Sequence, residues 1–143
     1  MNRRTLLQAM GTAAVMPFMG GIAAEGQAAG GAVDKDTVYE LRIYHTSKLD
    51  ALLARFGGAE RQIFERVGMH CVAFWTATDE PLKGATLIYI LRHKSREAAD
   101  ASWKAFRADP EWQKVKAESE KDGSLVDKSE STFMALTSFS PKL

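Results

Sequence analysis

Two hydrophobic periodicities follow one another along the chain, and their order restricts the folds that it can form. Four segments alternate apolar or β-branched residues with polar ones, which is the period of a β-strand with one buried face. These segments are Thr37–His45, Cys71–Ala77, Thr86–Arg92 and Ser131–Phe139. Two longer segments, at residues 47–67 and 95–122, repeat apolar residues at the spacing of an amphipathic helix. The predicted order is strand, helix, strand, strand, helix, strand.

The first helical segment carries its own boundary signals. Ser47 is placed to cap it, and Gly68 is placed to end it. Gly57 and Gly58 lie in its middle, where each glycine costs about 1 kcal/mol relative to alanine. Because the apolar stripe keeps its register across this pair, we expect one helix that is kinked or loosened there.

The second helical segment is predicted to form in two pieces. Ser95 caps the first piece, whose inward-facing residues include Trp103. Asp109 caps the second piece, and Pro110 then occupies the first helical position, where proline loses no hydrogen bond. Gly123 marks the end of this helix.

This order of elements predicts an α+β domain. Strand, helix, strand, strand, helix, strand folds as a four-stranded antiparallel sheet with the helices on one face, which is the ferredoxin-like βαββαβ arrangement. The turn composition of residues 79–84 joins the two middle strands as a hairpin.

Helices cover only one face of such a sheet, and the other face is predicted to be apolar. It would carry Phe74 or Trp75, Ile88 or Tyr89, and Phe133. Burial is worth roughly 25 cal/mol per Å² of apolar surface, so a second sheet is the natural cover. We therefore expect a homodimer in which two open faces meet as a dimeric α/β barrel. The alternative is a monomer whose tail or second-helix segment covers that face.

Residues 1–28 are not expected to belong to this domain. The segment Arg3–Leu7 resembles the bacterial twin-arginine pattern, and a short, weakly apolar stretch at Ala9–Ala24 follows before small residues suited to cleavage. The stretch is too short and too rich in Gly and Ala to span a membrane. We expect a twin-arginine signal peptide at 1–28, a flexible lead-in at 29–36 and one domain at 37–141, exported to the periplasm or secreted. An ordinary secretory signal is the alternative.

Charge and cysteine content exclude several classes of function. The signal segment carries two arginines and one glutamate, so its removal lowers the net charge from +1 to near zero. A neutral domain has no electrostatic basis for binding nucleic acid or an anionic membrane surface. Cys71 is the only cysteine, so no internal disulfide can form. No cofactor is evident, because the sequence has no phosphate-binding loop, zinc spacing or serine elbow.

Four motifs resemble, in the right order, those of the NIPSNAP family. Val38–Tyr44 resembles the family's opening strand, and Gly68–Trp75 resembles its Gly-led second strand that ends in an aromatic residue and Trp. Ala108–Trp112 resembles its Asp-Pro-Glu-Trp turn, and Phe139–Pro141 resembles its terminal Phe-Ser-Pro. The resemblance covers residues 37–141 and implies a ferredoxin-like fold that forms dimeric α/β barrels. It implies no agreed reaction and no catalytic residues.

Glu40, Arg42 and Tyr44 share one face of the first predicted strand. If the apolar face of that strand meets the helices, these three side chains point into the barrel. An arginine beside a carboxylate and a phenol could then orient an acidic or carbonyl ligand, with Trp75 lining the same site. The alternative is an internal ion pair that satisfies itself, because buried charges are usually paired.

Two histidines flank the predicted hairpin. His70 and His93 lie equally far from the middle of its turn, so they would face each other across the strands and could bind a metal or relay protons. A register shift of one residue would instead pair His70 with Arg92. No third ligand is evident, so we expect two solvent-accessible strand-end histidines and no metal site. His45 ends the first strand, yet nothing marks it as a haem ligand.

Three functions stay open at this point. The first is the binding of a small organic ligand inside the barrel near Glu40, Arg42, Tyr44 and Trp75, with or without catalysis. The second is a non-catalytic dimerisation or interaction module. The third is a small haem- or metal-dependent oxidoreductase. The sequence alone does not decide whether the protein is an enzyme.

Overall fold

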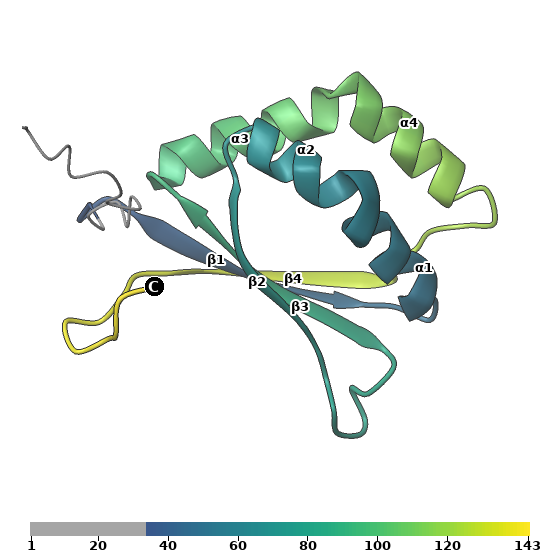
Figure 1. Ribbon diagram of the computed structural model, residues 1–143, viewed down its shortest axis with the longest axis horizontal. Helices are drawn as coiled ribbons and strands as arrows, with labels where there is room; N and C mark the ends of the chain where they lie inside the picture. The colour runs from purple at the N-terminus through teal and green to yellow at the C-terminus, as the bar shows by residue number, and fades with distance from the viewer. Residues whose placement is uncertain (1–33) are drawn as a thin grey trace, which may run out of the picture. The chain divides into compact units, whose positions relative to one another are not determined.

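The computed structural model describes residues 34–143, so the predicted signal peptide and most of the lead-in lie outside the described residues. Four strands form one antiparallel sheet in the order β2-β3-β1-β4 (Figure 1). The strands are β1 (Val38–His45), β2 (His70–Thr76), β3 (Thr86–His93) and β4 (Lys128–Met134). Both helical segments lie over the same face of this sheet (Figure 1). The ferredoxin-like α+β fold is therefore confirmed.

The first helical segment is broken where the glycine pair predicts. It consists of α1 (Leu49–Arg55), the π-helical turn η1 (Phe56–Glu60) and α2 (Arg61–Arg66), and Gly58 has non-helical dihedral angles. Gly68 ends the segment with a φ of +93°. The predicted cap is wrong, because the helix begins after Lys48 and the backbone N–H of Ser47 donates to Asp127 Oδ2 at 2.8 Å. A contact distant in sequence thus replaces the local cap.

The second helical segment forms the two predicted pieces, α3 (Arg96–Ala108) and α4 (Pro110–Ser119). The Ser95 hydroxyl accepts a hydrogen bond from the backbone N–H of Ala98 at 3.0 Å. Asp109 accepts from the N–H groups of Glu111 and Trp112, at 3.0 and 3.1 Å. Both caps are confirmed. No helix within residues 34–143 has the length and apolar character that would span a membrane.

The last strand differs from its prediction. β4 runs from Lys128 to Met134, whereas the sequence pattern predicts Ser131–Phe139. Pairing with β1 sets its length, because Lys128 lies opposite His45 and Met134 lies opposite Tyr39. The residues after Met134 pair with no strand of the described chain, and Phe139 among them is 86% exposed.

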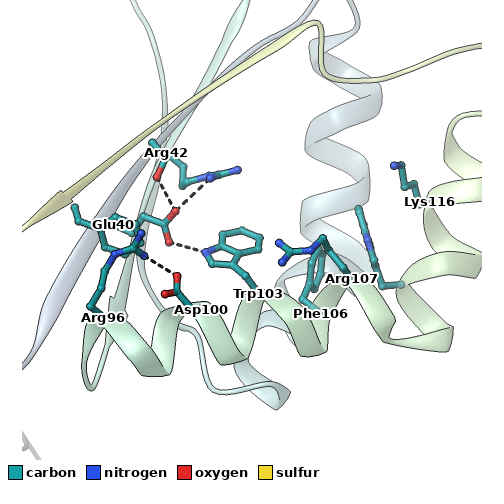
Figure 2. Close-up of a pocket in the computed structure, with 11 residues that line it drawn as sticks. Glu40, Arg42, Arg96, Asp100, Trp103, Phe106, Arg107 and Lys116 are labelled. Carbon is teal, nitrogen blue, oxygen red and sulfur yellow. Dashed lines mark hydrogen bonds and ion pairs between the residues drawn. The ribbon is translucent and has the colours of Figure 1, made fainter.

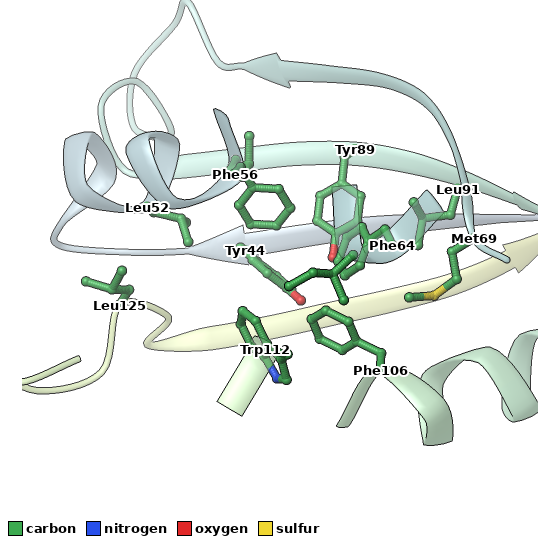
Figure 3. Close-up of a cluster of buried hydrophobic side chains, with 12 residues drawn as sticks. Tyr44, Leu52, Phe56, Phe64, Met69, Tyr89, Leu91, Phe106, Trp112 and Leu125 are labelled. Carbon is green, nitrogen blue, oxygen red and sulfur yellow. The ribbon is translucent and has the colours of Figure 1, made fainter. Parts of the chain in front are cut away.

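The apolar core lies between the sheet and the helices, and it is largely aromatic (Figure 3). Tyr44 of β1 and Tyr89 of β3 meet edge to face there, with ring centroids 5.3 Å apart, and Phe56 lies equally close to Tyr89. The buried cluster comprises Tyr44, Leu52, Phe56, Ile63, Phe64, Met69, Leu87, Tyr89, Leu91, Phe106, Trp112 and Leu125.

The expected orientation of β1 is wrong. Tyr44 lies in the core, and Glu40 accepts a hydrogen bond from Trp103 of α3, so this face of β1 meets the helices rather than a barrel interior. Leu41 and Ile43 point to the open face of the sheet and are only half-buried. An alternating pattern shows that one face is apolar, but it does not show which layer that face will meet.

Candidate functional site

An open pocket of about 580 Å³ lies between the sheet and the second helical segment (Figure 2). Strands β1 and β4 form one wall, and helices α3 and α4 form the other. Four aromatic residues and six charged ones line it, together with one serine. The lining residues are Glu40, Arg42, Arg96, Asp100, Trp103, Phe106, Arg107, Trp112, Lys116, Ser131 and Phe133.

The carboxylate of Glu40 is the most constrained group of this pocket. The residue is 1% exposed. One oxygen accepts from Trp103 Nε1 at 2.7 Å and from His93 Nε2 at 3.0 Å. The other accepts from Ser131 Oγ at 2.8 Å and from Arg42 Nη1 at 3.2 Å. Glu40 is thus held by two strands and a helix besides its own strand.

These contacts fix the charge of Glu40. Burial alone would raise its pKa, but the hydrogen bonds from His93, Trp103 and Ser131 and the charge of Arg42 lower the pKa from 4.5 to about 2. The carboxylate is therefore ionised at neutral pH, and four donors already occupy its oxygens. Because an ionised carboxylate can only accept, Nε2 of His93 is the donor of their hydrogen bond.

Arg42 connects this carboxylate to the core. Its Nη2 donates to Tyr44 Oη at 3.2 Å, and its guanidinium lies 4.7 Å from the ring centroid of Trp103. Burial opposes the charge of Arg42, but Tyr44, Tyr89 and Glu40 raise its pKa above the ordinary value. Its Nε is buried and has no partner among the described residues. Arg42 is therefore a fixed cation with one unused donor.

The cations at the rim fall into two groups. Arg96 pairs with Asp100 at 2.9 Å and lies 3.6 Å over the ring of Phe133. Arg107 and Lys116 have no carboxylate within ion-pair distance in the part of the chain that the structure describes. Figure 2 shows the two ion pairs toward one end of the pocket and Lys116 toward the other, and Arg107 lies between them.

A second buried charged cluster lies on the other side of Trp112. Arg55 donates through Nε to Glu60 at 2.8 Å and through Nη1 to Glu120 at 2.9 Å, and its guanidinium lies 5.0 Å from the ring of Trp112. Burial raises the pKa of Glu60 to about 7 against the lowering effect of Arg55. Glu60 ends the π-helical turn, and this cluster fixes that turn against α4.

The structure brings together three of the four residues proposed from sequence. Glu40, Arg42 and Tyr44 form one hydrogen-bonded chain. The expectation for Trp75 is wrong: it is 47% exposed on the open face, next to Ile88 of β3. Its neighbour Phe74 points to the core instead and stacks on Tyr89 at 5.4 Å.

The paired-histidine prediction is also wrong. A bulge between Cys71 and Ala73 shifts the register of β2, so His70 lies opposite Arg92 and not opposite His93. His93 is 1% exposed rather than solvent-accessible, whereas His70 is exposed and its Nδ1 lies 3.4 Å from Glu65 Oε2. Residues 34–143 contain no cluster of three potential metal ligands.

Cys71 does not belong to the candidate site. Burial and the neighbouring Glu65 raise the pKa of its thiol to about 12, so it is not a thiolate at neutral pH.

Sequence reasoning missed the helical half of this site. Arg96, Asp100, Trp103 and Arg107 follow one another at spacings of four, three and four residues, which places them on one stripe of α3. That spacing is readable in the sequence, but only the sheet order shows that the stripe faces β1 and β4. Ser131 carried no signal of its own.

Comparisons with solved structures agree with this fold. A NIPSNAP-like domain protein from Burkholderia xenovorans has a TM-score of 0.66 and 19% identity, covering 77% of this chain and 93% of its own. A NIPSNAP family protein of unknown function from Agrobacterium tumefaciens has a TM-score of 0.65 and 20% identity, covering 76% and 96%. At these identities the likeness shows the fold alone.

Two oxygenase structures are more distant. SnoaB, a cofactor-independent oxygenase from Streptomyces nogalater, has a TM-score of 0.51 and 14% identity over 74% of this chain and 98% of its own. A Streptomyces coelicolor monooxygenase in complex with nanaomycin D also has a TM-score of 0.51, with 15% identity over 75% and 94%. No curated protein matches the chain by sequence.

A family model gives the assignment. The NIPSNAP model matches residues 39–141, which include β1 from its second residue, the other three strands and both helical segments. The chain therefore belongs to the NIPSNAP family.

Proposed function

We propose that this protein binds a small organic ligand in the pocket between strands β1 and β4 and helices α3 and α4. The observation that carries the proposal is the pocket itself, whose volume of about 580 Å³ falls in the range of small-molecule sites. Four aromatic residues line it, and hydrogen bonds hold the Glu40 carboxylate and the Arg42 guanidinium in fixed positions on its strand wall. The proposal moves the site from the barrel interior to the helical side of the sheet.

The charge state of Glu40 favours binding over acid–base catalysis at this carboxylate. A general base needs a free lone pair and a pKa near the working pH. Glu40 has a pKa of about 2 and accepts four hydrogen bonds. The carboxylate therefore serves as an anchor that holds Arg42 and Trp103 in fixed orientations beside the pocket.

The test compares two tryptophan substitutions. Trp103→Phe removes the indole N–H and part of the ring inside the pocket, while Trp75→Phe makes the same change on the open face. The protein is purified from its natural compartment, and native mass spectrometry records any ligand mass that it retains. We expect Trp103→Phe to lose this mass and Trp75→Phe to keep it, with circular dichroism confirming that both variants are folded.

The opposite result would place the site on the open face, as the sequence suggested. A wild-type protein that never carries or takes up a ligand would favour an interaction module instead. Retained haem or metal would favour the oxidoreductase alternative, and absorbance and elemental analysis would identify either.

The proposal includes a homodimer that forms through the open face of the sheet. Cross-strand neighbours there are apolar: Leu41 lies opposite Ile90, and Ile88 lies between Ile43 and Trp75. None of the described helices covers these residues, since α4 packs on the same side as the other helices (Figure 1). An apolar stripe of this kind is typical of an interface.

Two charged substitutions test the dimer. Ile88→Glu introduces a charge in the middle of the stripe, and Leu82→Glu introduces the same charge at an exposed turn residue. Light scattering should report a monomer for Ile88→Glu and a dimer for wild type and Leu82→Glu. A wild-type monomer would refute the interface.

Export through the twin-arginine route also belongs to the proposal, and its support is the sequence of residues 1–28. Replacing Arg3 and Arg4 with lysine should leave the precursor in the cytoplasm, as measured by cell fractionation. Export that continues unchanged would favour the ordinary secretory signal.

A further inference from the structure

We infer that the pocket takes a planar aromatic anion, such as an aromatic carboxylate, whose charge lies between Arg107 and Lys116. This inference rests on the proposed function, because it names the class of ligand for the same site. Its basis is the combination of two unneutralised cations with an aromatic wall.

The first step is the charge of the pocket. Four cations and two carboxylates line it. Glu40 is paired with Arg42, and Asp100 is paired with Arg96. The remaining positive charge comes from Arg107 and Lys116.

This local charge stands out against the rest of the domain. The chain carries +1, and residues 1–33 contribute two arginines and one glutamate, so residues 34–143 are neutral overall. An excess of two cations in one pocket of a neutral domain attracts an anion there.

The second step is the position of the two cations. Arg107 lies in the last turn of α3, and Lys116 lies two turns into α4. Both residues border the aromatic part of the pocket (Figure 2). The two ion pairs lie toward the other end, where their residues belong to β1 and to the first turns of α3. An anionic group at this end would meet charges from two different helices.

The start of α4 does not offer a competing anion site. The carboxylate of Asp109 already accepts the N–H groups of Glu111 and Trp112. An anionic ligand in this pocket must therefore use side chains.

The third step is the wall against which the rest of the ligand would lie. The ring centroids of Trp103 and Phe106 are 5.7 Å apart in an edge-to-face arrangement, and those of Phe106 and Trp112 are 4.4 Å apart, so the three rings form one contiguous aromatic cluster. Phe106 and Trp112 are almost fully buried, and Trp103 is half-buried. A flat ring placed against Trp103 would gain apolar contact and remain within reach of the cationic end.

The experiment uses two probes with the same ring system. 2-Naphthoate carries a carboxylate, and 2-naphthalenemethanol is its uncharged counterpart. Each is titrated into ¹⁵N-labelled protein, and the indole N–H signals of Trp103, Trp112 and Trp75 are followed by NMR. We expect 2-naphthoate to shift the signals of Trp103 and Trp112 and to bind about tenfold more tightly than the alcohol.

A pair of double variants isolates the charge. Arg107→Gln with Lys116→Gln removes the two unneutralised cations. Lys104→Gln with Lys114→Gln removes two exposed cations of the same two helices, and neither of these lysines lines the pocket. The first double variant should weaken 2-naphthoate about tenfold and leave the alcohol unchanged, and the second should change neither. Raising the salt concentration should weaken the binding of 2-naphthoate and leave the binding of the alcohol unchanged.

The outcomes separate a failure of the anion inference from a failure of the ligand pocket itself. Equal affinity for both probes, or equal losses in the two double variants, would overturn the anion inference and leave the ligand pocket in place. Shifts confined to Trp75 would place binding on the open face and refute both. No binding of either probe would also refute both for aromatic ligands of this size.

Discussion

Replacing Glu40 with glutamine measures how much its buried carboxylate stabilises the fold. The substitution keeps the shape but sets an amide N–H₂ group among the donors of Trp103, His93, Ser131 and Arg42. Folding lowers the pKa of Glu40 from 4.5 to about 2, which corresponds to at most about 3 kcal/mol of unfolding free energy. The expected contribution of the Glu40 carboxylate to the unfolding free energy is about 2 kcal/mol, because the open pocket admits solvent that screens part of its interactions.

The pH dependence of this contribution follows from the sign of the change. Because folding lowers the pKa of Glu40, its contribution is complete above the pKa of the unfolded chain. It is lost as the pH falls toward 2. Urea unfolding of the wild type and of Glu40→Gln should therefore differ by about 2 kcal/mol near neutral pH, and this difference should shrink in acid.

The control is Glu118→Gln, an exposed glutamate of α4 that makes no ion pair in the described chain. It should unfold like the wild type at every pH. A Glu40 carboxyl signal that titrates by NMR near its ordinary pKa would refute the reasoning. So would a difference between wild type and Glu40→Gln that stays constant from neutral to acidic pH.

Three further substitutions and one control test other parts of the structure by urea unfolding. Folding raises the pKa of Glu60 to about 7, so ionisation of this carboxyl group destabilises the fold as the pH rises. The unfolding free energy of Glu60→Gln should therefore increase by about 1–3 kcal/mol relative to that of the wild type between acidic and mildly basic pH. A difference that stays constant with pH would contradict this. Gly68→Ala should lower the unfolding free energy by about 1–2 kcal/mol, because φ is +93° and the new Cβ would lie 3.3 Å from Ser102 Oγ. As a control, a Cβ at Gly57 would meet nothing within 4 Å, so Gly57→Ala should not destabilise the fold. Ser95→Ala should cost about 1 kcal/mol through the lost cap, and an unchanged stability would show that the cap hydrogen bond contributes nothing.

The features predictable from sequence are those that depend on neighbouring residues. The caps at Ser95 and Asp109 act within one turn of helix, so their residue types are enough to identify them. The break at Gly57 and Gly58 follows from backbone propensity in the same way. These local signals agree with the order of elements, and together they give the fold class.

The face of each strand could not be predicted, because it depends on which layer the strand meets. On β1 the polar face meets the helices, where Trp103, His93 and Ser131 satisfy Glu40. These three residues are distant from Glu40 in sequence. Alternation alone treats the two faces of a strand as equivalent, so it does not show which face of β1 packs against the helices.

A single bulge accounts for the error in the hairpin. Residues Ala73–Thr76 pair with β3 in the register that the symmetric hairpin predicts. The extra residue between Cys71 and Ala73 then moves His70 opposite Arg92. Nothing in the residue types at this point distinguishes a bulge from a regular strand.

The sheet order has a consequence for the timing of folding. Among the described strands, β4 pairs only with β1, and the hydrogen bond from Ser131 to Glu40 joins residues that are 91 positions apart. During synthesis, a chain that has not yet extended past Ser131 has β1, β2, β3 and both helical segments, but its pocket lacks the part of the sheet wall that β4 supplies. Closing so long a loop is slow compared with forming local turns. Ligand binding would therefore distinguish a chain that includes β4 from one that stops before Ser131, and truncation before Ser131 should abolish binding while helix content is retained.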